Sequence, residues 1–73
     1  MYKETLNRLP IKVRQRLRKF NRMLNLETVN RSSVISIVDD YLLALEDMGM
    51  IDLEESYGLW EMVVTDGIND DLV

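Results

Sequence analysis

The chain has 73 residues, of which 47% are hydrophobic, and it contains no Cys and no His. A chain of this length buries only about 60% of its unfolded surface, so we expect one small domain, 1–73, of marginal stability, with an acidic tail at about 69–73. Without Cys and His, disulfides, ordinary zinc sites and Ser-His or Cys-His nucleophile systems are excluded, and the composition fits a reducing cytoplasm.

Charge is divided along the chain. Residues 1–31 hold all nine Lys and Arg residues and two acids, a net charge of +7, whereas residues 32–73 hold the other eleven acids and no base, a net charge of −11. A division this complete predicts separate positive and negative surfaces. In the alternative, the two halves neutralise each other within the fold or between two copies in a homodimer.

Two helices are predicted in the basic half. The first runs from about Tyr2 to Leu9, and Pro10 marks a boundary because proline suits the first turn of a new helix. The second helix spans 11–26. Its narrow apolar stripe repeats with helical spacing at Val13, Leu17, Phe20 and Leu24. Its basic residues lie outside this stripe and form a wide cationic face: Lys12, Arg14, Arg16, Arg18, Lys19 and Arg22.

A third helix, 33–48, is predicted after a weakly periodic connection. Ser32 or Ser33 is expected to cap its first turn, and Gly49 is expected to end it in a left-handed conformation. Its core face is expected to hold Val34, Ile37, Val38, Tyr41, Leu42, Leu45 and Met48. Its outer face is acidic with one projecting leucine, and consists of Ser36, Asp39, Asp40, Leu43, Glu46 and Asp47.

The segment 51–66 supports two interpretations. A β-hairpin is indicated by the alternation at 51–54, the turn-like sequence 56–58 and the β-branched run at 63–65. A helix is indicated by the capping-box pair Asp52 and Glu55 and by the spacing of Leu53, Tyr57, Trp60 and Val64. We predict the hairpin, because a glycine in mid-helix at position 58 costs about 1 kcal/mol. In either case Tyr57 and Trp60 are expected to pack in the core.

The sequences NRSSV, LALEDMGMID and MVVTDG, within about residues 30–68, resemble the recognition helix and wing of winged helix-turn-helix regulators. This resemblance implies a mainly α fold, with a three-helix helix-turn-helix-like core and a C-terminal β-hairpin. The alternative is an all-α four-helix bundle. Helix 33–48 contains no Lys or Arg. As a recognition helix it would be repelled by DNA, which carries one negative charge per roughly 1.7 Å of axis.

The function predicted from these features is binding. We expect no enzymatic activity, no cofactor and no metal site. We also expect no membrane span, because the longest apolar run, 41–45, is too short to cross a bilayer. The first hypothesis is a regulator that acts through another protein with a basic surface, such as a DNA-binding repressor, and it uses Asp39, Asp40, Leu43, Glu46 and Asp47. The alternative is a DNA-binding regulator whose phosphate contacts are Lys12, Arg14, Arg16, Arg18, Lys19, Arg22 and Arg31.

Overall fold

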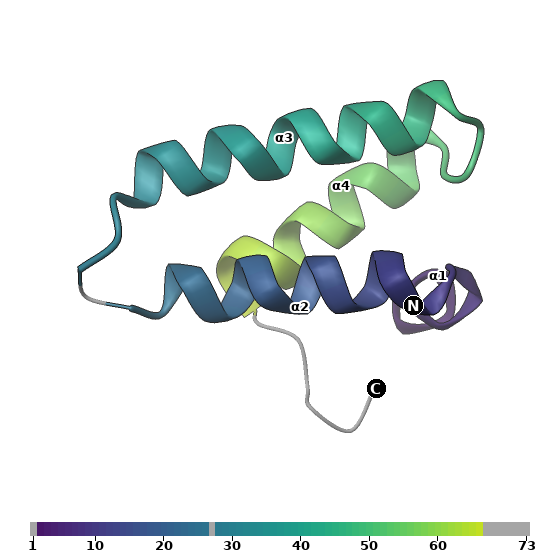
Figure 1. The fold of residues 1–73 in the computed structure, drawn as a ribbon. Helices are drawn as coiled ribbons and strands as arrows, with labels where there is room; N and C mark the ends of the chain where they lie inside the picture. Colours follow the sequence, from purple (N-terminus) through teal and green to yellow (C-terminus); the bar gives the residue numbers. More distant parts are fainter. Residues whose placement is uncertain (1, 27, 67–73) are drawn as a thin grey trace.

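The structure is a computed structural model that describes residues 2–26 and 28–66. Its described residues form four α-helices, α1 (Tyr2–Arg8), α2 (Ile11–Leu24), α3 (Arg31–Asp47) and α4 (Leu53–Glu61), followed by a short π-helical segment, η1 (Met62–Asp66). Figure 1 shows α2 and α3 running in opposite directions, with α4 crossing them diagonally. The long helix α3 packs on both α2 and α4, while α1 packs on α4 and η1 packs on α2.

The predicted C-terminal β-hairpin is wrong, and the all-α alternative is correct for the residues described. Residues 53–61 are helical because their first turn is capped from both sides. Asp52 Oδ1 accepts a hydrogen bond from the Glu55 N–H at 2.8 Å, and Glu55 Oε1 accepts one from the Asp52 N–H at 3.0 Å. These bonds satisfy two N–H groups that would otherwise lack partners, and they favour the start of a helix at this point.

The helix boundaries follow local capping rules. Pro10 precedes α2, as predicted. The cap of α3 is Asn30, whose side chain accepts a hydrogen bond from the Ser33 N–H at 3.3 Å, so the predicted serine caps at 32 and 33 are wrong. Gly49 has the expected left-handed conformation, with φ +75°. The N–H of Gly49 donates to the carbonyl of Glu46 and that of Met50 to the carbonyl of Leu45, the two bonds of a Schellman motif.

The core is built from apolar residues of all four helices, of η1 and of two connections between helices. Phe20 of α2 meets Tyr41 of α3 edge to face, with ring centroids 5.6 Å apart. On α3 the predicted core face is only partly correct, because Ile37 and Met48 are exposed. The buried apolar residues are Leu6, Leu9, Leu17, Phe20, Leu24, Val34, Val38, Leu42, Leu45, Ile51, Leu59 and Val63. The predicted acidic tail at 69–73 lies outside the described residues.

Candidate functional site

A groove lies between α3 and α4, with a volume of about 510 Å³. One wall is built from α3 and the other from α4, which is why neither helix by itself reveals it. Both walls carry large apolar side chains, and both contribute carboxylates. The lining residues are Asp39, Asp40, Leu42, Leu43, Glu46, Leu53, Ser56, Tyr57, Trp60 and Glu61.

The α4 wall is an apolar stripe that no other helix of the described structure covers. Leu53, Tyr57 and Trp60 follow the i, i+4, i+7 spacing, which brings them onto one face of a helix. The side of α4 that enters the core carries Leu59 instead, and Val63 of η1 is buried after it. As a result Leu53 is 65% exposed and Tyr57 is 67% exposed, whereas Trp60 is half-buried. The prediction that Tyr57 packs in the core is therefore wrong.

The charged residues that line the groove are all acidic. Asp39, Asp40 and Glu46 come from α3 and Glu61 comes from α4, and no Lys or Arg lines the groove. Four carboxylates around a low-polarity surface produce a negative potential that favours a cationic partner. No group of three or more acidic side chains among the described residues is placed to hold a metal ion. The carboxylates are thus distributed along the groove and do not converge on one point.

The groove contains most of the predicted protein-binding residues and adds others that the prediction missed. Asp39, Asp40, Leu43 and Glu46 all line it, whereas Asp47 is exposed outside it. The missed contributors are Leu42, Leu53, Ser56, Tyr57, Trp60 and Glu61. The helical spacing of Leu53, Tyr57 and Trp60 is visible in the sequence, but Tyr57 and Trp60 are predicted in the core, and only Trp60 packs partly against it. Only the packing of α4 on its other face shows that this stripe is open.

The residues predicted to contact phosphates differ in their exposure and in their hydrogen bonds. Lys12, Arg16, Lys19 and Arg22 are exposed on α2, whereas Arg14 and Arg18 are half-buried. Arg31 is exposed too, but its guanidinium Nη1 donates to the carbonyl of Leu24 at 3.0 Å. That bond satisfies a carbonyl in the last turn of α2 and ties this turn to the first turn of α3. Arg31 therefore has a structural role in the connection between the two helices.

Arg16 also acts on a neighbouring ring. Burial raises the pKa of Tyr41 above its ordinary value, because the phenolate would be poorly solvated, and the Arg16 guanidinium opposes this shift. Tyr41 belongs to the contact between α2 and α3 through its ring contact with Phe20. The cationic face and the core thus meet at this ring, on a different side of α3 from the groove.

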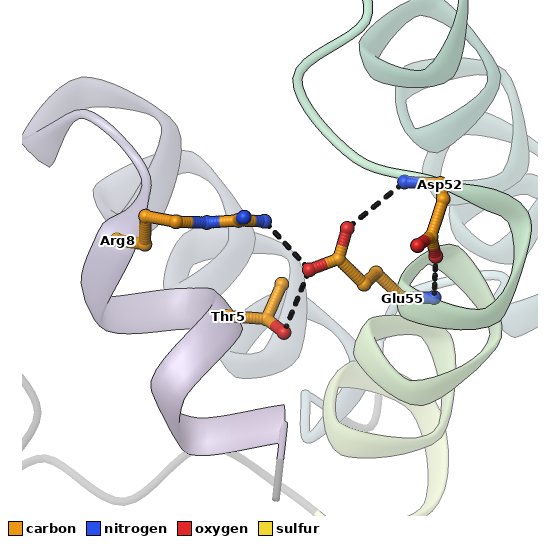
Figure 2. A network of polar contacts seen from close by, with 4 residues as sticks. All are labelled: Thr5, Arg8, Asp52 and Glu55. Atoms are coloured by element: carbon orange, nitrogen blue, oxygen red, sulfur yellow. Dashed lines mark hydrogen bonds and ion pairs between the residues drawn. The ribbon is translucent and has the colours of Figure 1, made fainter.

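A polar cluster fixes α4 relative to α1 (Figure 2). Glu55 Oε2 accepts hydrogen bonds from Arg8 Nη2 at 2.6 Å and from Thr5 Oγ1 at 3.2 Å, while its Oε1 accepts the capping bond from Asp52 N–H at 3.0 Å. One carboxylate therefore serves both as a helix cap and as the link between the two helices. Because α4 forms one wall of the groove, this cluster also orients that wall.

Comparison of the chain with protein-family models, with curated proteins and with solved structures gives no match. The resemblance to winged helix-turn-helix regulators therefore stays a prediction, and the hairpin that it implied is replaced by α4. Among the described residues, no helix has both the length and the apolar character needed to cross a membrane.

Proposed function

We propose that this protein is a small non-enzymatic regulatory protein that acts by binding another protein, with the α3–α4 groove as its binding site. The observation that carries the proposal is the combination of exposed Leu43, Leu53 and Tyr57 with carboxylates that line the same groove. Exposed apolar surface bordered by polar residues is typical of protein–protein interaction sites. The charges would speed the encounter, and the apolar side chains would prolong the complex.

The partner that fits this surface carries Lys and Arg. A DNA-binding protein such as a repressor is the partner class we propose, because its phosphate-contacting surface is basic and the acidic groove offers charges of the same sign as DNA. Occupation of that surface would block DNA binding. Such a regulator would act in the cytoplasm.

Charge reversal in the groove tests this proposal. Asp39→Lys with Asp40→Lys should abolish capture of the partner from the lysate of the native host. The matched control, Asp47→Lys with Glu54→Lys, makes the same change in net charge at exposed positions outside the groove and should keep capture. Nuclease treatment should leave capture unchanged, and the captured protein should lose its DNA when the wild-type protein is added. Equal capture by both variants would contradict the proposal.

A second candidate function is direct DNA binding through α2. It is favoured by the exposure of Lys12, Arg16, Lys19 and Arg22 on this helix. If these four side chains each neutralised one phosphate, the logarithm of the binding constant would fall against the logarithm of salt concentration with a slope of about −3.6. A gel shift at low salt measures this directly, and its absence would remove the second candidate.

A further inference from the structure

We infer that the natural occupant of the α3–α4 groove is an amphipathic α-helix of the partner, with apolar side chains on the face that enters the groove and Lys or Arg along both flanks. This inference rests on the proposed function and specifies the kind of partner segment. The inference follows from the volume of the groove, from the apolar and acidic side chains that line it, and from the occupants that its charge excludes.

The groove is large enough to hold several side chains. Its volume of about 510 Å³ falls within the range of roughly 300–1,000 Å³ that is usual for ligand pockets. Leu53 and Trp60 are seven residues apart on α4, which corresponds to about 10 Å along a helix axis. A bound helix would therefore place anchors at i, i+4 and i+7 against this wall, the pattern of helix-in-groove recognition.

The described structure does not offer what other modes of peptide recognition require. Addition of a β-strand needs an exposed sheet edge, and the described residues form helices and no strand. Proline-rich segments dock in grooves lined by aromatic rings. Both rings of this groove, Tyr57 and Trp60, belong to α4, and the opposite wall is made of the aliphatic Leu42 and Leu43. Aliphatic walls suit the branched and unbranched side chains of an amphipathic helix.

The charge of the groove argues against a second copy of this chain. If two copies met groove to groove, Asp39, Asp40, Glu46 and Glu61 of each copy would face the same four carboxylates of the other, and like charges in proximity are destabilising. The cationic face of α2 from a second copy has a charge opposite to that of the groove, but it lacks the apolar side chains that would fill the groove. Among the large apolar side chains of α2, only Ile11 is exposed, so this helix has no row of anchors for the groove.

Lys and Arg on the flanks of a bound helix would complete the interface. Apolar anchors would cover Leu43, Leu53 and Tyr57, and cationic side chains one turn away would reach the carboxylates of Asp39 and Glu46. Such side chains can lay their aliphatic stems on the apolar wall while the charged ends meet the carboxylates. A single bound helix would then contact both the apolar side chains and the carboxylates of the groove.

A designed peptide tests the inference with a readout that the chain already provides. Trp60 lines the groove and is the only Trp of the protein, so its fluorescence reports occupation of the groove. The probe is a synthetic peptide of about 16 residues with Leu at i, i+4, i+7 and i+11, Lys at the flanking positions and no Trp, which would span about four turns. We expect saturable binding, accompanied by a shift of the Trp60 emission to shorter wavelength and a rise in peptide helicity.

Variants in the groove and a matched control decide where the peptide binds. Tyr57→Ala should weaken binding by at least about tenfold, as is common for a central aromatic residue of an interface. Leu43→Ser should weaken it by a similar factor. Ile37→Ser is the control, because Ile37 is 49% exposed and Leu43 is 55% exposed on the same helix, but only Leu43 lines the groove. The control should bind the peptide within about twofold of the wild type.

Three comparison peptides identify the occupant. A scrambled isomer, which distributes Leu around the helix, and an isomer with Glu in place of Lys should both fail to bind. If a proline-rich peptide of equal charge binds more tightly than the helical one, the inference is overturned in favour of an extended segment. If Leu43→Ser instead abolishes a concentration-dependent dimer of the protein itself, a second copy is the occupant and the inference is also overturned.

Failure of this inference is distinguishable from failure of the proposed function. Absence of peptide binding, or equal binding to the Leu43→Ser and Ile37→Ser variants, overturns the helical occupant. The proposed function is judged separately, by whether Asp39→Lys with Asp40→Lys abolishes partner capture. Retention of that effect without peptide binding would mean that the groove captures a folded basic surface and not a helix.

Discussion

The α3–α4 groove and the outer face of α2 are both exposed and both charged, yet only the groove combines charge with uncovered apolar surface. Its carboxylates border Leu43, Leu53 and Tyr57, whereas the exposed basic residues Lys12 and Lys19 lie on a face of α2 that has no row of apolar side chains. Charge by itself steers an encounter and is screened by salt, while apolar burial makes a complex persist. We therefore propose specific, lasting contact at the groove and only transient attraction at α2.

The largest expected effect separates the two faces of α4. Leu59→Ala removes a fully buried side chain and should destabilise the fold by about 2–5 kcal/mol, because it loses apolar burial and leaves a cavity. Leu53→Ala, on the groove side of the same helix, should change stability by less than about 0.5 kcal/mol. Urea denaturation followed by circular dichroism measures both. Similar losses for the two variants would mean that Leu53 is covered and that the groove is closed in solution.

An effect of intermediate size is expected at the cluster that orients the groove wall. Glu55→Ala removes one partner of the capping box and the acceptor for Thr5 and Arg8, and should cost about 1–2 kcal/mol. The Arg8 side chain is largely exposed, so the ion pair contributes little of this. Glu54→Ala is the neighbouring control and should cost about 0.5 kcal/mol or less. Thermal unfolding of the two variants checks the difference.

A smaller effect tests whether the two surfaces act independently. Replacement of Lys12, Lys19 and Arg22 by Gln should leave binding of the basic helical peptide to the groove unchanged or slightly stronger, because these cations lie on α2 and do not line the groove. Any DNA binding should lose about 0.9 from its salt slope for each phosphate contact removed. A peptide affinity that falls by more than about tenfold would show that the two surfaces form one site.

The smallest effect concerns the ring that joins α2 to α3. The pKa of Tyr41 is raised from 10.0 by burial, and Arg16 opposes this shift, so Arg16→Gln should raise it further. Because the folded state holds the phenol proton more tightly than the unfolded state, this group leaves stability unchanged below about pH 10 and reduces it as the pH rises further. Absorbance of the phenolate band follows the titration, with Tyr41→Phe as the control. An unshifted titration would place Tyr41 in solvent.

The paired residues of the capping box show how much of α4 was predictable and why the wrong interpretation prevailed. The sequence shows Asp52 and Glu55, which predict the start of a helix. Gly58 and the run at 63–65 disfavour a helix, and the hairpin prediction rests on them. The structure resolves this competition through the burial of Leu59 and Val63, which tertiary packing adds to the local cap. The low helix propensity of Gly58 and of residues 63–65 is therefore outweighed by contacts with residues distant in sequence, which a local pattern does not contain.

Local sequence patterns are enough to predict the helical segments of the first two thirds of the chain, the break at Pro10 and the end of the long helix at Gly49. These features depend on residues within about one helical turn of each other, so their signals are local. Which side of α4 enters the core depends on the packing of the other helices. An apolar stripe shows that a helix has a face to cover, but whether another helix covers it depends on how the remaining elements pack. That choice buried Leu59, left Leu53 and Tyr57 exposed, and formed the groove with Leu43 and the acids of α3.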